Sequence, residues 1–181
     1  MLLSASQASL LIVDVQDRLL PVMVEPDRVT SRCKILLQAA EALQIPVTIS
    51  EQYPKGLGHT VPELETNTAT VFEKLSFSCW RDTAMKEHFI ELHDGGRPLV
   101  VVAGIEAHVC VLQSCADLYN AGFGVFVVAD AASSRKLDSA TLAFGRLKQI
   151  GIQVLITEMV IFEWLEKAGS AEFKNLSALI K

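Results

Sequence analysis

The chain alternates between short, densely apolar runs and longer stretches in which apolar residues recur every three or four positions. The short runs predict buried strands over 9–13, 46–50, 70–72, 99–103, 124–128 and 152–157. The helical spacing predicts helices over 28–45, 82–92, 111–121 and 139–150. Strands that are apolar on both faces are typical of parallel sheets covered by helices. The pattern therefore predicts a doubly wound α/β fold, a six-stranded, mostly parallel sheet with helices on both faces, as a single domain over 1–181.

The run LVVVA at 99–103 leads into the stretch GIEAHVCV, which places Cys110 near the start of the next predicted helix. The dipole and the unpaired amides at a helix N-terminus favour a thiolate, which is the nucleophilic form of cysteine. Taken alone, this stretch is more typical of a buried structural cysteine, because free cysteine is among the most buried residue types.

Two further chemically useful side chains follow predicted strands. Asp14 comes directly after the strand over 9–13, and Lys74 follows the strand over 70–72. Each has an ordinary alternative, a turn or cap for Asp14 and a surface cation for Lys74. Because the carboxyl ends of parallel strands share one edge of the sheet, we expect Asp14, Lys74 and Cys110 to converge there.

The composition and charge of the chain argue against some classes of binding partner. Half of the 181 residues are hydrophobic, and the formal net charge is −5. The sequence has no basic stripe and no stretch rich in both arginine and aromatic residues, so it predicts no nucleic-acid partner. Its apolar runs are too short to cross a bilayer, and the first residues lack the basic region of a signal peptide, so we expect a cytoplasmic protein away from membranes. The four cysteines form no C-x-x-C pair, which suits a reducing compartment and disfavours a zinc site.

Several motifs together resemble the isochorismatase-like hydrolase superfamily. They are LIVDVQD, FEKLSFS, GIEAHVCV and the closing TEMVIFEWL, in that order along nearly the whole chain. The likeness is closest to the short isochorismatase-domain hydrolases of the cysteine hydrolase branch. It implies a six-stranded α/β/α sandwich and an Asp-Lys-Cys catalytic triad of Asp14, Lys74 and Cys110.

The resemblance also implies a cis peptide bond between Ile105 and Glu106. The amides of Glu106 or Ala107, with that of Cys110, would then form an oxyanion hole. Nicotinamidases of this superfamily carry an Asp-x-His metal motif, whereas the matching positions here are Glu51 and Tyr53. Together with His59 these residues make a poor ligand set, so we expect no metal and no cofactor.

The sequence therefore predicts a cysteine hydrolase that cleaves a small amide or related C–N bond through a thioester. One alternative is a vinyl-ether hydrolase of the isochorismatase kind, with Asp14 as the acid. Another is a binding or scaffold protein of the same fold without turnover. Five residues near the predicted site are expected to line a pocket for a small-molecule substrate: Gln16, Tyr53, Phe77, Trp80 and His108.

The chain ends in two short amphipathic stretches separated at Gly169. An apolar surface around Phe162 and Trp164 would suit contact with a neighbouring subunit. The resemblance also implies an oligomer, so we expect a homo-oligomer.

Overall fold

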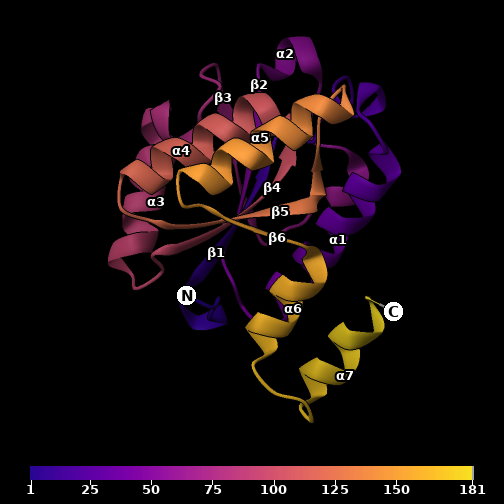
Figure 1. The fold of residues 1–181 in the computed structure, drawn as a ribbon, viewed down its shortest axis with the longest axis vertical. Helices are drawn as coiled ribbons and strands as arrows, with labels where there is room; N and C mark the ends of the chain where they lie inside the picture. The colour runs from indigo at the N-terminus through magenta and orange to yellow at the C-terminus, as the bar shows by residue number, and fades with distance from the viewer. Residues whose placement is uncertain (181) are drawn as a thin grey trace.

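The computed structural model describes residues 1–180 and contains one sheet of six strands, all parallel (Figure 1). The order across the sheet is β3-β2-β1-β4-β5-β6. The strands are β1 (Ala8–Val13), β2 (Val47–Gln52), β3 (Ala69–Lys74), β4 (Leu99–Ile105), β5 (Gly124–Ser133) and β6 (Gln153–Leu155). The predicted α/β class is confirmed.

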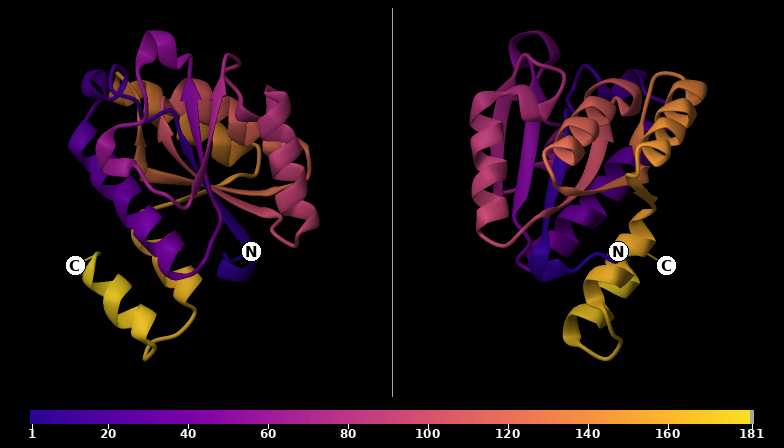
Figure 2. Two further views of the ribbon diagram at one scale, coloured as in Figure 1. Left: turned by 180° about the vertical axis from the view of Figure 1, so that it is seen from behind. Right: turned by 60° about the vertical axis from the view of Figure 1, so that its left-hand side comes forward.

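Helices cover both faces of this sheet (Figure 2). One face packs against α1 (Pro26–Ala42) and α6 (Thr157–Leu165), and the other against α3 (Thr83–Asp94), α4 (Leu112–Asn120) and α5 (Leu137–Gln149). The short helix α2 (Pro54–Leu57) follows β2, and α7 (Ala171–Ala178) packs on α6. Single 3-10 turns occur at Ala5–Gln7, Leu20–Val22, Pro62–Leu64 and Cys79–Arg81, and a π-helical turn at Ala107–Val111.

The central strand β1 shows why the apolar runs form a sheet that is buried on both sides. Leu10 and Ile12 pack into the core beneath α1, whereas Leu11 and Val13 pack into the core beneath α3 and α4. Alternate side chains of a strand point to opposite faces, so a strand covered on both sides needs apolar residues throughout.

The strand order reverses between β1 and β4, and ligands of open parallel sheets bind at the carboxyl ends on either side of such a reversal. The two strands approach very closely at this end. Gly104 pairs with Val13 and has φ +114°, and a Cβ at Gly104 would lie 2.1 Å from the carbonyl oxygen of Val13. Glycine is therefore required for β4 to lie beside β1 at the edge that carries Asp14.

Strands β3 and β5 extend furthest beyond the predicted runs. The edge strand β3 continues to Lys74, so Lys74 is its last residue rather than a residue beyond its end. Strand β5 continues through Asp130 to Ser133. Asp130 therefore lies within the strand, where its carboxylate accepts hydrogen bonds from the backbone N–H and the hydroxyl of Thr157 at the start of α6.

The prediction of two short amphipathic stretches at the end of the chain is confirmed by α6 and α7. Helix α6 packs beside α1 on the face of the sheet, and α7 lies beyond the amino ends of the strands (Figure 1). The prediction of an exposed surface there is only half right. Phe162 is 44% exposed, but Trp164 is 3% exposed because it packs into the core beneath α1. No helix in residues 1–180 is both long and apolar enough to span a membrane.

Candidate active site

Three strand ends bring Asp14, Lys74 and Cys110 to one edge of the sheet. Asp14 directly follows β1 in a left-handed conformation (φ 51°), and Lys74 ends β3. Cys110 lies in the π-helical turn that joins β4 to α4. Asp14 is fully buried, Lys74 almost so, and Cys110 is 6% exposed. This edge is therefore a dry setting in which charges interact strongly.

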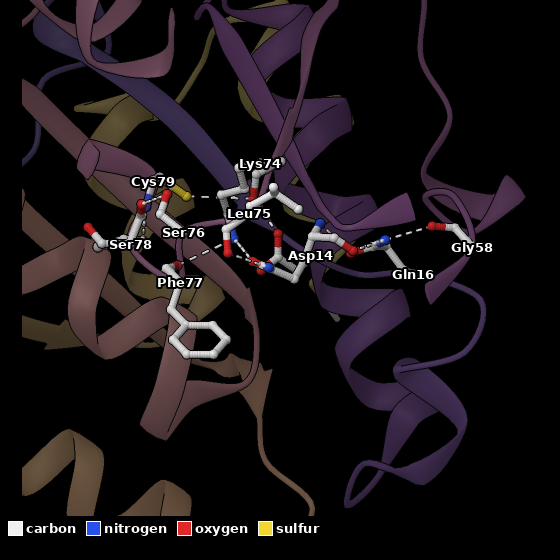
Figure 3. Close-up of polar contacts among 12 residues, drawn as sticks. Asp14, Gln16, Gly58, Lys74, Leu75, Ser76, Phe77, Ser78 and Cys79 are labelled. Carbon is white, nitrogen blue, oxygen red and sulfur yellow. Dashed lines mark hydrogen bonds and ion pairs between the residues drawn. The ribbon is translucent and has the colours of Figure 1, made fainter. Parts of the chain in front are cut away.

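Lys74 and Asp14 form a buried ion pair, with Lys74 Nζ 2.8 Å from Asp14 Oδ2 (Figure 3). The ammonium group also donates to Gln52 Oε1 at 2.7 Å and to the carbonyl oxygen of Phe77 at 3.3 Å. An ammonium group has three donors. All three are thus directed at protein acceptors, which fixes the position of the positive charge.

The second oxygen of the Asp14 carboxylate is also held by the protein. Ser50 Oγ donates to Asp14 Oδ1 at 2.7 Å, and Cys79 Sγ lies 3.6 Å from Ser50 Oγ as a donor to it. Ser50 and Cys79 are both fully buried. Both oxygens of the carboxylate therefore have a fixed partner.

The thiol of Cys110 faces this carboxylate. Burial raises the pKa of the Cys110 thiol, and the charge of Asp14 and a hydrogen bond to it raise the pKa further, whereas Lys74 lowers it. The raised pKa of Cys110 does not support the expectation of a thiolate stabilised by the start of a helix. A thiol with a raised pKa needs a base to become a nucleophile.

The surroundings of Asp14 and Lys74 suit such a base. Burial raises the pKa of Asp14 above its ordinary value, although the charge of Lys74 and the hydrogen bonds to the carboxylate oppose that rise. Burial, the largest single effect, lowers the pKa of Lys74, but the charge of Asp14, the neighbouring cysteines and the hydrogen bond to Asp14 together outweigh it, so the pKa of Lys74 is raised. Lys74 therefore stays protonated beside a carboxylate with increased proton affinity.

Gln16, which the sequence predicts to line the substrate pocket, instead bonds to backbone groups of the neighbouring chain segments. It is fully buried, and its amide nitrogen donates to the carbonyl oxygens of Gln52 (3.1 Å) and Gly58 (2.6 Å). Its amide oxygen accepts from the backbone N–H of Gln52 at 2.7 Å. Since both ends of the amide bond to backbone, Gln16 braces the end of β2 and does not face a ligand.

The three aromatic residues expected in the pocket do not lie together. Tyr53 and Phe77 are 51% and 53% exposed. Tyr53 lines a cavity of about 500 Å³ beside the backbone of Lys74. Trp80 packs edge-on against Phe123 at a centroid distance of 5.5 Å, with Lys86 Nζ 5.4 Å above its ring. The prediction that Trp80 lines the pocket is thus corrected, because its ring is used in packing between helices.

The turn before Cys110 is tied to the loop that follows β5. The peptide bond between Ile105 and Glu106 is cis. The carboxylate of Glu106 accepts from the backbone N–H of Arg135 at 3.2 Å and from its Nε at 3.0 Å. His108 Nδ1 lies 2.9 Å from Ser134 Oγ, so one ring nitrogen of His108 is already engaged.

Glu51 and His59, the remaining candidates for a ligand set, bind each other and the loop between them. Glu51 accepts from the backbone N–H and hydroxyl of Thr60 at 2.7 and 2.8 Å, and lies 2.9 Å from His59 Nδ1. Within residues 1–180, no three or more His, Cys, Asp or Glu side chains are grouped so that they could hold a metal ion.

Ser50 and Gln52 are the two site residues that sequence reasoning missed. They contact Asp14 and Lys74 directly. A signal was present in the sequence, since Thr48, Ser50 and Gln52 alternate with other residues along a strand expected to be apolar on both faces. Polar residues at every second position of such a strand indicate that one of its faces meets a polar site.

Comparison with known proteins agrees with this architecture. A sequence model described as the isochorismatase domain matches residues 8–159. Isochorismatase domain-containing protein 2 of Danio rerio is 36% identical over 179 residues, which is 98% of this chain and 89% of that protein.

Two solved structures are similar along almost the whole chain. A structure described as MAR1 ribonuclease from Caenorhabditis elegans is 33% identical with a TM-score of 0.90, covering 99% of this chain and 92% of that one. The YcaC gene product of Escherichia coli, described as an octameric hydrolase of unknown specificity, is 25% identical with a TM-score of 0.88, covering 99% and 90%. The chain, with its parallel sheet and its polar edge around Asp14, belongs to the isochorismatase family.

Proposed function

We propose that this isochorismatase-family protein is a cysteine hydrolase that cleaves a small amide or related C–N bond, with Asp14, Lys74 and Cys110 as its catalytic residues. The observation that carries the proposal is the buried Asp14–Lys74 ion pair with the Cys110 thiol facing its carboxylate. A buried thiol beside a base of increased proton affinity is the arrangement that nucleophilic catalysis requires.

In the proposed reaction, Asp14 takes the proton of Cys110 as the sulfur attacks the carbonyl carbon. The tetrahedral oxyanion accepts hydrogen bonds from the backbone amides of Glu106 or Ala107 and of Cys110. Ala107 begins the π-helical turn, and the first amides of a helix have no partner within it. As the C–N bond breaks, Asp14 returns its proton to the leaving nitrogen, and the acyl group stays on sulfur as a thioester.

Water completes the cycle. Asp14 removes a proton from water as its oxygen attacks the thioester, and the carboxylic acid leaves as sulfur regains a proton. Lys74 acts here as a fixed charge, since its three donors are directed at Asp14, Gln52 and Phe77. It compensates the negative charge that moves between Asp14 and sulfur and does not need to touch the substrate.

A second candidate is a vinyl-ether hydrolase in which Asp14 protonates the substrate. The raised pKa of Asp14, caused first by its burial, favours this role as an acid. The two reactions differ in their need for sulfur. The amidase requires Cys110, whereas the vinyl-ether reaction needs only Asp14.

We propose no ribonuclease activity for this chain, although the Caenorhabditis elegans structure is described as a ribonuclease. A ribonuclease binds phosphates largely through basic groups, and this chain has a formal net charge of −5. The octameric description of the Escherichia coli relative does support our proposal that this chain forms a homo-oligomer. Size-exclusion chromatography with light scattering would measure the mass of this oligomer in solution.

The proposed function is tested with a panel of small amides, ureas, esters and vinyl ethers, assayed with the wild type, Cys110→Ala and Asp14→Asn. The proposal predicts hydrolysis of an amide or related C–N bond that both substitutions abolish, and an acyl adduct on Cys110 by mass spectrometry. Vinyl-ether turnover that survives Cys110→Ala would favour the second candidate. The absence of turnover on every compound would favour a binding protein.

A further inference from the structure

The position of Ser50 in β2 determines which groups its side chain contacts. Thr48, Ser50 and Gln52 occupy alternate positions and so share one face of the strand, whereas Val47 and Ile49 pack on the opposite side in the core beneath α1. Ser50 is fully buried, and its hydroxyl donates to Asp14 Oδ1 at 2.7 Å. A buried hydroxyl on a strand that bonds a charged group is costly to remove and precise in its direction.

Each hydrogen bond around Ser50 has a defined donor and a defined acceptor. Cys79 Sγ donates to Ser50 Oγ at 3.6 Å, and the Ser50 hydroxyl donates onward to Asp14. The backbone N–H of Asp14 donates in turn to the carbonyl oxygen of Ser50 at 3.0 Å. Ser50 therefore contacts Asp14 through both its side chain and its backbone, so the carboxylate cannot rotate freely.

We propose that Ser50 is a positioning residue, which holds Asp14 so that one carboxylate oxygen pairs with Lys74 while the carboxylate keeps its negative charge toward Cys110. The inference deepens the proposed function, because it names a residue that prepares the base without touching the substrate. Cys79 supports Ser50 from behind, through the thiol that donates to the Ser50 oxygen.

Removal of the Ser50 hydroxyl should therefore change the pKa of Asp14. The groups that face Asp14 are the ammonium of Lys74 from β3, the thiol of Cys110 from the π-helical turn and, through Ser50, the thiol of Cys79. The hydrogen bond from Ser50 favours the ionised carboxylate and so lowers the pKa of Asp14, against the larger effect of burial. Removing that donor raises the pKa of Asp14.

The experiment measures the Asp14 carboxyl by carbon-13 NMR titration in the full-length protein, which requires no turnover. Ser50→Ala is expected to move the Asp14 titration to higher pH, and Ser50→Thr, which keeps the hydroxyl, to restore it. Ser9→Ala is the matched control, because Ser9 is a fully buried serine of the neighbouring strand β1 whose hydroxyl bonds only the carbonyl oxygen of Leu99. An Asp14 titration that is unchanged in Ser50→Ala overturns the inference.

If Ser50→Ala does not fold, a second variant, Ser50→Cys, tests the same proposal. Ser50→Cys keeps the shape of the side chain with a weaker donor and is expected to shift the titration in the same direction by less. In the active enzyme, the acid limb of kcat/KM should move to higher pH in parallel, with about a tenfold loss of rate per pH unit below it. A shifted titration with an unmoved acid limb would support the positioning by Ser50 while contradicting the proposed role of Asp14 as the base.

Discussion

Individual buried side chains at this edge of the sheet direct their hydrogen-bonding groups at protein partners. Gln16 is the clearest example, since it uses both ends of its amide to hold the backbone at the ends of β2 and α2. The motif DVQD therefore combines two roles, a chemical one proposed for Asp14 and a structural one for Gln16.

Replacing Gln16 by leucine should destabilise the protein by about 3 kcal/mol, because it leaves the buried backbone groups of Gln52 and the partly buried carbonyl of Gly58 without their Gln16 partner. Urea unfolding of the two proteins measures the difference. Gln149→Leu on the exposed side of α5 is the control and should change the free energy of unfolding by less than about 0.5 kcal/mol. Equal effects of the two substitutions would contradict the bracing role.

Lys74→Met should cost about 3–5 kcal/mol at neutral pH, because it leaves the Asp14 carboxylate buried without its partner. The pKa of Asp14, already raised from 3.8, rises further in this variant. A carboxyl with a higher pKa in the folded than in the unfolded state stabilises the fold when protonated, and that contribution is lost as the pH rises through the folded pKa. The deficit relative to wild type should therefore be smaller near about pH 4 than near about pH 8.

The same unfolding measurements check this pH dependence, with the exposed Lys34→Met of α1 as the control. A deficit that stays constant between the two pH values would argue that Lys74 stabilises the protein through packing rather than through its charge.

At the scale of elements, the site depends on how closely β4 approaches β1. The two strands flank the reversal of strand order, and each is followed by a proposed catalytic residue, Asp14 after β1 and Cys110 after β4. Gly104 allows this approach because it has no Cβ and adopts a positive φ.

Gly104→Ala should therefore destabilise the protein by roughly 3 kcal/mol or more, since the new Cβ collides with the backbone of Val13. Gly145→Ala is the matched comparison, because Gly145 lies within α5 with open space where its Cβ would be. That substitution should stabilise the helix by about 0.5–1 kcal/mol. Thermal unfolding of both variants checks the pair, and a stable Gly104→Ala protein would show that the strand ends can separate.

For the whole molecule, the apolar pattern was sufficient to predict the class of fold. Continuous apolar runs such as 99–103 predict strands covered on both faces, and the parallel arrangement then predicts that strand ends share an edge. The true length of β3 was not predictable in this way. An edge strand is only half covered, so its apolar signal is short and ends before Lys74.

The proposed catalytic residues could be predicted from the sequence, but not their supporting contacts. Asp14, Lys74 and Cys110 have chemically useful side chains at or soon after strand ends, so their convergence follows from topology. The contacts of Gln16, Trp80 and Ser50 depend on side-chain packing between elements distant in sequence, which spacing does not encode. The Cys110 pKa differs from the expected one for the same reason, because burial and the neighbouring Asp14 raise it.

The distribution of the four cysteines through the molecule predicts selective alkylation by iodoacetamide. Cys33, Cys79 and Cys115 are fully buried. Burial raises the pKa of Cys33 to about 12 and that of Cys79 to about 11. Cys110 combines slight exposure with a neighbouring base, so the native protein should gain one adduct, on Cys110, before any other cysteine reacts. Peptide mapping checks the site, and prior labelling of Cys79 would contradict the structure.

The measurement that tests the central claim most directly is the pH dependence of Cys110 alkylation in the wild type and in Asp14→Asn. If Asp14 is the base for Cys110, the wild-type thiol reacts at neutral pH with an acid limb set by Asp14. In Asp14→Asn that limb is lost, and alkylation follows the titration of the Cys110 thiol alone. Identical profiles for the two proteins would contradict the assignment of Asp14 and Cys110 to one catalytic unit.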